Sequence, residues 1–121
     1  MKKVLVVDDN EEILNVISIL LDMEGYKVKC QDTGLEIFDT VFSYAPDIIL
    51  LDIMLGNSDG REICRELKSN PGTKHIPIIM ISASHNINAV PGKECHAEDF
   101  IAKPFNIDHL VAKVGQYVNS N

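Results

Sequence analysis

Five groups that could do chemistry stand directly after short apolar runs of the sequence. They are three carboxylates, one hydroxyl and one ammonium, contributed by Asp8, Asp9, Asp52, Ser82 and Lys103. Two like charges about 4 Å apart repel by about 4 kcal/mol at an effective dielectric of 20, so clustered carboxylates need a proton or a cation between them. Oxygen ligands with room left for water suit Mg²⁺. With a hydroxyl and an ammonium nearby, such a site suits phosphoryl chemistry, because these groups would neutralise or hydrogen-bond the phosphoryl oxygens.

The runs that precede these groups have the pattern of buried β-strands, and amphipathic segments lie between them. Strands are expected over 4–7, 26–30, 47–52, 76–81 and 100–102. Apolar residues at helical spacing predict helices within 10–25, 33–46, 63–70 and 110–118, with Asn10 as a cap and Gly25 as a stop. Strands that alternate with helices predict a parallel α/β sheet with helices on both faces. Ligands bind beside the carboxyl ends of such strands, where the five groups are expected to meet.

Length and composition narrow the class of protein. A chain of 121 residues, 45% of them hydrophobic, fits one domain over residues 1–121. Eighteen acidic residues against eleven Lys and Arg give a formal charge of −7, which argues against nucleic acid and anionic membranes as direct partners. Three separated cysteines, no signal-peptide pattern and no apolar run of membrane-spanning length lead us to expect a cytoplasmic location.

Five spaced motifs occur in a recognisable order along the chain. They are Val-Leu-Val-Val-Asp8-Asp9-Asn10, Pro46-Asp-Ile-Ile-Leu-Leu-Asp52-Ile-Met-Leu, Asp59-Gly60, Ile-Pro77-Ile-Ile-Met-Ile-Ser82-Ala83, and Asp99-Phe100-Ile-Ala-Lys103-Pro104-Phe105. In this order, and over essentially the whole chain, they resemble the CheY-like receiver domain of bacterial two-component response regulators. The resemblance implies a doubly wound (βα)5 sandwich of flavodoxin-like type, with a five-stranded parallel sheet of order 2-1-3-4-5.

The resemblance also implies a role for each carboxylate. Asp52 would be the phosphoacceptor, which receives a phosphoryl group from a histidine kinase or a histidine phosphotransfer protein. Asp8 and Asp9 would hold Mg²⁺ together with Asp52 and the backbone carbonyl of Met54. The domain would be no enzyme toward other substrates, because it would catalyse only its own phosphorylation and dephosphorylation.

The resemblance implies roles for four further positions, of which Ser82 and Phe100 would form the switch and Lys103 would act with Asp52 and Ser82 in the phosphoryl transfer. Ser82 would be the switch hydroxyl that moves to the aspartyl phosphate, and Lys103 would pair with a phosphoryl oxygen. Phe100 stands at the switch aromatic position, and Lys103-Pro104 would be a cis peptide. Phosphorylation adds about two negative charges to an acceptor side chain, so the movement of these groups would alter binding of a downstream protein partner. A monomer or a weak homodimer is expected.

Three departures from the family pattern stand out. Gly56 replaces the usual proline after the phosphoacceptor, so that loop should be looser. The segment between Ser82 and Lys103 carries Pro91-Gly92 and has His96 where glycine is usual, which predicts a shortened or irregular fourth helix. Phe100 lacks the hydroxyl of the commoner tyrosine, so its inward rotamer should be favoured.

Two other functions compete with a phosphorylated switch. A phosphohydrolase of the haloacid dehalogenase type would need a second Asp two residues after Asp52, where Met54 stands, and no phosphate-binding glycine motif is present for a nucleotide-binding fold. The remaining alternative is a receiver-like docking module that acts without phosphorylation. Receivers of that kind usually lose an acid or the lysine, whereas all of them are retained in this sequence.

Overall fold

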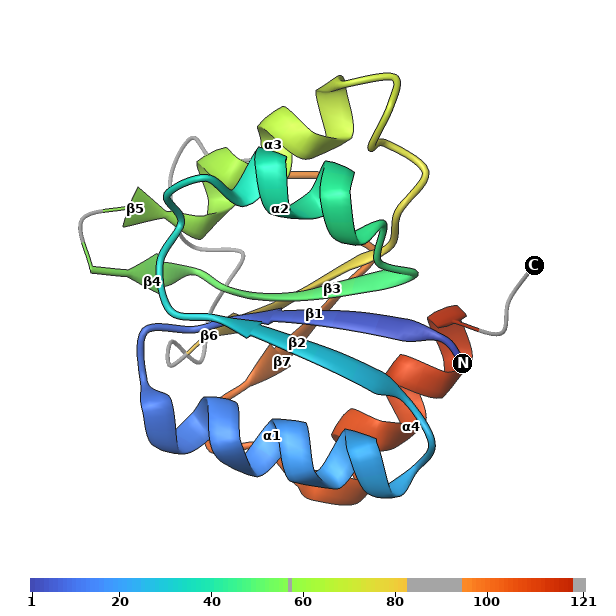
Figure 1. Ribbon diagram of the computed structural model, residues 1–121. Coiled ribbons are helices and arrows are strands. Elements are labelled where there is room, and N and C mark those ends of the chain that lie inside the picture. Colours follow the sequence, from blue (N-terminus) through green and yellow to red (C-terminus); the bar gives the residue numbers. More distant parts are fainter. Residues whose placement is uncertain (57, 83–94, 119–121) are drawn as a thin grey trace.

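A five-stranded parallel sheet lies between two layers of helices in this computed structural model (Figure 1), which describes residues 1–56, 58–82 and 95–118. The sheet order is β2-β1-β3-β6-β7, and every neighbouring pair is parallel. In chain order these strands are the first to the fifth of the main sheet, so the predicted order 2-1-3-4-5 is confirmed. The strands are β1 (Lys3–Val7), β2 (Lys27–Gln31), β3 (Ile48–Asp52), β6 (Ile78–Ser82) and β7 (Asp99–Ala102).

The described part of the chain contains four helices, and Figure 1 shows that they cover both faces of the sheet. Helices α1 (Glu11–Met23) and α4 (Ile107–Val118) cover one face, and α2 (Ile37–Tyr44) and α3 (Gly60–Ser69) cover the other. Each side of the sheet is filled by its own cluster of buried side chains, because alternate residues of a strand point to opposite faces. In β1, Val4 and Val6 pack toward α1 and α4, whereas Leu5 and Val7 pack toward α2 and α3.

The central strands are buried on both faces, which explains why their sequences are almost continuously apolar. Every residue of β3 and of β6 is buried, including the polar residues that end them, Asp52 and Ser82. The edge strand β2 is largely exposed and carries alternating polar residues instead. These are the patterns expected for inner and outer strands of a sheet with helices on both sides.

Local signals set the helix boundaries, and one boundary differs from the prediction. The Asn10 side chain accepts hydrogen bonds from the Glu12 and Ile13 amides, so it is the N-cap of α1 as expected. Helix α2 was expected from residue 33 but starts at Ile37, because Glu36 has the left-handed conformation with φ 61°. A non-glycine residue in that conformation does not continue a right-handed helix.

The loop after β3 contains an element that the sequence did not reveal. Strands β4 (Met54–Leu55) and β5 (Ser58–Asp59) pair antiparallel, in a small ribbon separate from the main sheet. Gly56 lies between them with φ 58°, a left-handed conformation that glycine adopts easily. The loop that was predicted to be looser is therefore partly ordered by strand pairing, within the residues that the structure describes.

The predicted irregular fourth helix lies almost wholly in residues 83–94, outside the described residues. The segment from Cys95 to Ala97 is described and has neither helix nor strand, and His96 there has φ 57°. None of the helices in the described ranges is long and apolar enough to cross a membrane.

Candidate functional site

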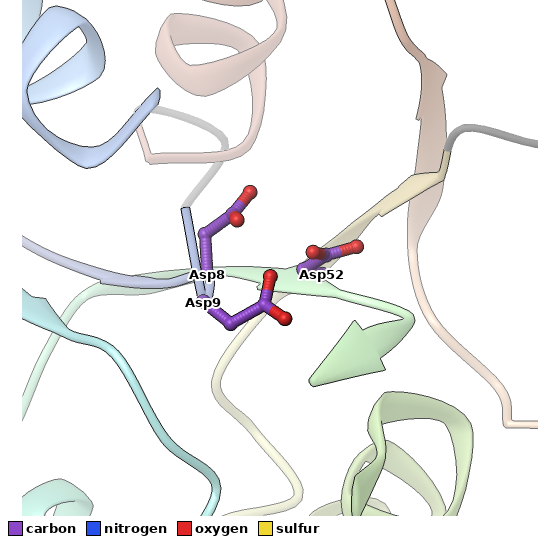
Figure 2. Close-up of side chains that lie close together, drawn as sticks. All are labelled: Asp8, Asp9 and Asp52. Atoms are coloured by element: carbon purple, nitrogen blue, oxygen red, sulfur yellow. The ribbon is translucent and has the colours of Figure 1, made fainter. Parts of the chain in front are cut away.

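Three carboxylates meet at the carboxyl ends of β1 and β3, as Figure 2 shows. Asp8 and Asp9 follow β1, and Asp52 is the last residue of the neighbouring strand β3. The register pairs Val7 with Leu51, so Asp8 and Asp52, the residues that come next, emerge at the same level of the sheet. One ligand oxygen from each carboxylate lies within 4.8 Å of the others. The expected acidic cluster is therefore assembled by strand register.

The three carboxylates differ in burial and in how firmly they are held. Asp8 has no exposed surface, Asp52 is 3% exposed and Asp9 is exposed. Asp8 Oδ1 accepts a hydrogen bond of 2.9 Å from the Asn10 amide, next to the start of α1. Asp52 Oδ1 accepts a longer one, of 3.2 Å, from the Met54 amide. Asp8 is thus anchored at the helix cap, whereas the contacts that Asp52 makes with the described residues are long, at the weak end of the usual range.

Lys103 supplies the positive charge of the site. Its Nζ lies 3.0 Å from Asp8 Oδ2 and 3.4 Å from Asp52 Oδ2. Lys103 follows β7, and its backbone N–H donates to the Ser82 carbonyl at 2.7 Å, which fixes its position beside β6. The Lys103-Pro104 peptide is cis, as predicted. An ammonium from the edge strand therefore reaches across to carboxylates on two inner strands.

The local charges alter the proton affinity of the acceptor candidate. Burial, followed by the charge of Asp8, raises the pKa of Asp52 from 3.8 to about 6, against the opposing effect of Lys103 and of the Met54 amide. Burial lowers the pKa of Lys103, but hydrogen bonding to Asp8 and the charges of Asp52 and Asp8 outweigh it, so the net shift is upward. Because the pKa of Asp52 is raised, a metal ion and a proton compete for this carboxyl group.

The remaining predicted site residues lie on the neighbouring strands. Ser82 is buried at the end of β6, and its register partner is Ala102, directly before Lys103. Asp52 pairs with Ile81, so Ser82 lies one residue beyond the level of Asp52. Phe100, on β7, is partly buried and packs against the core cluster on the α2 and α3 side. Met54, by contrast, is 66% exposed beside Asp52.

Gly60 has a structural role that the sequence did not explain. Its amide donates to the Ile53 carbonyl at 2.7 Å, and a Cβ built on Gly60 would lie 2.1 Å from the Asp52 backbone oxygen. Only glycine allows α3 to start this close to β3. Asp59 caps α3 from the adjacent position, accepting from the Arg61 amide. The Asp59-Gly60 motif thus holds the start of α3 against the backbone of the acceptor candidate.

The donor set fits a small, hard divalent cation. Asp8 Oδ2 is a buried oxygen whose close neighbour is the Lys103 ammonium, 3.0 Å away. Three oxygen donors, one of them on an exposed side chain, would leave coordination positions for water or substrate, as Mg²⁺ requires. The acidic cluster can therefore hold the ion that the sequence predicted.

The comparisons with known proteins agree with this fold. The family model described as response regulator receiver domain matches residues 4–115. The chain belongs to that family. Its function class is accordingly that of a signalling switch in two-component systems, in which such domains interact with kinases or downstream partners.

Solved structures of receiver domains share the fold over nearly the whole chain. The receiver domain of a signal transduction histidine kinase from Syntrophus aciditrophicus is 28% identical, with a TM-score of 0.90 over 99% of this chain and 92% of that one. The receiver domain of NtrX from Brucella abortus is 30% identical, with a TM-score of 0.86 over 98% and 99% of the two chains. A CheY-like receiver domain protein from Methanospirillum hungatei is 26% identical, with a TM-score of 0.88 over 99% and 95%.

Proposed function

We propose that this domain is a phosphorylation-activated switch in which Asp52 accepts a phosphoryl group in a Mg²⁺-dependent reaction. The observation that carries the proposal is the convergence of Asp52, Asp8 and Lys103 at one edge of the sheet, with Lys103 Nζ 3.0 and 3.4 Å from the two carboxylates. A buried acceptor beside a fixed cation is suited to a reaction in which negative charge develops on transferred oxygens.

The proposed step transfers a phosphoryl group from a histidine nitrogen to a carboxylate oxygen of Asp52. A carboxylate oxygen of Asp52 attacks the phosphorus of a phosphohistidine, and the P–N bond breaks. The electron pair of that bond returns to the imidazole nitrogen, which takes up a proton. The long contacts of Asp52, at 3.2 and 3.4 Å, are given up at little cost as the new P–O bond forms.

The acidic cluster would hold the metal ion. Asp8, Asp9 and Asp52 are the side-chain ligands in this proposal, and the Met54 backbone carbonyl is the fourth protein ligand. When bound, Mg²⁺ neutralises charge on the phosphoryl oxygens and on the attacking carboxylate. Asp8 keeps its ligand oxygen in place through the Asn10 amide, so the ligand is oriented before the ion arrives.

The switch follows from the charge that Asp52 gains. Lys103, whose ammonium reaches Asp52 from the end of edge strand β7, then pairs with a phosphoryl oxygen. The Ser82 hydroxyl donates to another, because Ser82 ends β6, which lies beside β3. Movement of these strand ends allows Phe100 to turn inward, since it already packs against the core. A downstream protein partner that prefers the altered surface then binds more tightly.

We assign the phosphoryl donor to a histidine kinase or a histidine phosphotransfer protein. The domain itself is proposed to act on no other substrate, to make no direct contact with nucleic acid or membrane, and to be a monomer or a weak homodimer in the cytoplasm. The charge of −7 supports the exclusion of nucleic acid, because phosphate backbones are bound by Lys and Arg.

Incubation with acetyl phosphate and Mg²⁺, followed by intact mass measurement, tests the proposal. One phosphoryl adduct is expected in the wild type and none in Asp52→Asn. Asp47→Asn is the matched control, because Asp47 directly precedes the same strand at the opposite end of the sheet. An adduct of equal yield in Asp52→Asn contradicts the assignment of the acceptor. No adduct in the folded wild type favours the docking module that acts without phosphorylation.

A further inference from the structure

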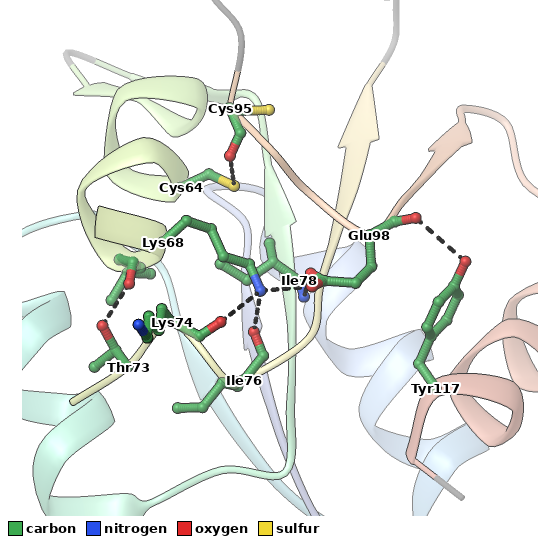
Figure 3. Close-up of polar contacts among 10 residues, drawn as sticks. Cys64, Lys68, Thr73, Lys74, Ile76, Ile78, Cys95, Glu98 and Tyr117 are labelled. Atoms are coloured by element: carbon green, nitrogen blue, oxygen red, sulfur yellow. Dashed lines mark hydrogen bonds and ion pairs between the residues drawn. The ribbon is translucent and has the colours of Figure 1, made fainter. Parts of the chain in front are cut away.

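Two buried cysteines lie against each other, away from the acidic cluster. Cys64 is on α3 and has no exposed surface, and Cys95, 4% exposed, lies in the segment that leads into β7. The Cys64 thiol donates a hydrogen bond to the Cys95 carbonyl oxygen, with Sγ and O 3.1 Å apart (Figure 3). Both residues belong to the core cluster on the α2 and α3 side of the sheet.

This contact limits how far apart the two residues can be. A carbonyl oxygen lies about 2.4 Å from the α-carbon of its own residue, so the Cys64 sulfur is within about 5.5 Å of the Cys95 α-carbon. A disulfide joins residues whose α-carbons are usually about 4.4–6.8 Å apart, and the Cys64 sulfur already lies near the Cys95 backbone. In Figure 3 the Cys95 sulfur points away from the Cys64 side chain, so the Cys95 side chain must rotate about its Cα–Cβ bond for the two sulfurs to meet.

We propose that Cys64 and Cys95 form a reversible disulfide when the protein meets a hydroperoxide, so that this pair is an oxidative modification site. The proposal stands apart from phosphorylation of Asp52, because neither cysteine belongs to the acidic cluster. A disulfide here would join α3 to the segment that precedes β7 and Phe100.

The surroundings favour Cys95 as the residue that reacts first. Hydrogen bonding with the Cys64 side chain, against the opposing effect of burial, lowers the pKa of Cys95 to about 6. The same interaction, with burial, raises the pKa of Cys64. Arg61, one helical turn before Cys64, has a buried Nη1 without a hydrogen-bond partner among the described residues. Its pKa is raised mainly by Asp59, with a smaller contribution from the charge of Cys95. Thiolates next to cations are the reactive ones.

The reaction balances with the hydroperoxide as the oxidant. The Cys95 thiolate attacks one peroxide oxygen, the O–O bond breaks, and the leaving hydroxide takes a proton to become water. The product is a sulfenic acid on Cys95. The Cys64 sulfur then attacks the Cys95 sulfur, loses its proton, and displaces the hydroxyl as a second water. Both thiols are oxidised by one electron each, and one peroxide is reduced to two waters.

The experiment uses the full chain with Cys30→Ser, which removes the exposed third cysteine. Protein is treated with hydrogen peroxide, denatured in iodoacetamide, and digested without reduction. A cross-linked peptide pair that contains Cys64 and Cys95, and that disappears after reduction, is expected in most molecules. Thiols that stay free to alkylation, or sulfinic acids without a cross-link, would overturn the proposal.

Two variants sharpen the result. Cys64→Ser on the same background removes the resolving thiol, so peroxide should leave a sulfenic acid on Cys95 that a dimedone probe captures. Cys95→Ser should leave Cys64 unreactive, because Cys64 has no exposed surface. If either variant fails to fold, peptide mapping of the Cys30→Ser protein still decides the question. Equal labelling of Cys64 by dimedone in Cys95→Ser would contradict the assigned order of reaction.

Discussion

The Lys103 ammonium lies between two buried carboxylates, 3.0 Å from Asp8 Oδ2 and 3.4 Å from Asp52 Oδ2. The contact joins the residue after edge strand β7 to the ends of β1 and β3. Because the carboxylates have almost no exposed surface, the ammonium is the positive charge that makes their proximity tolerable. The same ammonium is positioned to meet a phosphoryl group on Asp52.

Removal of this ammonium should destabilise the metal-free protein. In Lys103→Met the two carboxylates lose their counter-charge, and we expect a loss of about 1–3 kcal/mol in the free energy of unfolding at neutral pH. Mg²⁺ should restore part of that loss, since the ion can replace the missing charge. Urea unfolding with EDTA and with Mg²⁺ measures both effects.

Lys113→Met is the matched control for this measurement. Lys113 pairs with Asp99 at 2.7 Å, in a half-buried ion pair outside the acidic cluster. Its removal should cost about 1 kcal/mol or less, and Mg²⁺ should stabilise the variant as much as the wild type. Equal recovery by Mg²⁺ in both variants would show that Lys103 does not offset the metal-site carboxylates.

Asp52 should make the stability of the metal-free protein depend on pH. The pKa of Asp52 is about 6 in the folded protein, against an ordinary value of 3.8 for an unperturbed aspartate. Between pH 4 and 6 the folded state therefore binds more protons than the unfolded state. Protonated Asp52 therefore adds to the free energy of unfolding below pH 4, and this contribution is lost as the pH rises through 6. The difference in unfolding free energy between wild type and Asp52→Asn, measured in EDTA, should therefore change across pH 4–6. A constant difference over that window would refute the upward shift.

Gly60 should tolerate no side chain. In Gly60→Ala the Cβ would lie 2.1 Å from the Asp52 carbonyl oxygen, so α3 or β3 must move. We expect a loss of about 1–3 kcal/mol in unfolding free energy, together with a reduced yield of phosphoryl adduct.

Gly115→Ala serves as the control for this substitution. Gly115 lies within α4, and the nearest atom to an added Cβ is the Tyr26 hydroxyl oxygen at 3.7 Å, an ordinary contact. Alanine is the better helix former, so a gain of about 1 kcal/mol is expected, with an unchanged adduct yield. If Gly60→Ala causes no loss of unfolding free energy either, α3 is not held against Asp52 in the way described.

A lysine far from the acidic cluster, with a side chain only 8% exposed, should prove important for stability. Lys68 Nζ donates to the Lys74 and Ile76 carbonyls at 3.2 and 2.7 Å and to Glu98 Oε2 at 2.7 Å, as Figure 3 shows. Lys68→Met should cost about 2 kcal/mol, because two carbonyls and a carboxylate lose their donor. Lys74→Met, an exposed neighbour that keeps its carbonyl, should change stability by about 0.5 kcal/mol or less in the same thermal or urea measurement. Similar losses in the two variants would rule out this role for Lys68.

The sequence predicted the sheet well, because its inner strands are nearly pure apolar runs. Buried runs such as β3 and β6 end at polar residues, and the parallel arrangement then brings those ends together. Boundaries set by unusual backbone conformations were missed. Glu36 delays α2 with φ 61°, and Gly56 allows the β4–β5 ribbon with φ 58°. His96, noted in the sequence as a replacement for glycine, has the left-handed φ of 57° that glycine would favour.

Contacts between residues that are distant in the sequence could not be predicted from the sequence pattern. The sequence placed Lys103 at the correct edge, but its reach to Asp8 as well as Asp52 depends on the packing of three strands. The approach of Gly60 to the Asp52 backbone and the contact of Cys64 with Cys95 are likewise set by how α3 packs. Such distances require the relative positions of whole elements, which no local propensity encodes.

Location of the phosphoryl group on the chain tests the central proposal most directly. After incubation with acetyl phosphate and Mg²⁺, borohydride reduces an aspartyl phosphate to homoserine, and peptide mapping then identifies the altered residue. We predict homoserine at position 52 and at no other acidic residue, with the modification lost when EDTA replaces Mg²⁺. A phosphoryl group that maps to a histidine or to another carboxylate, or a folded wild type that is never modified, would contradict the account.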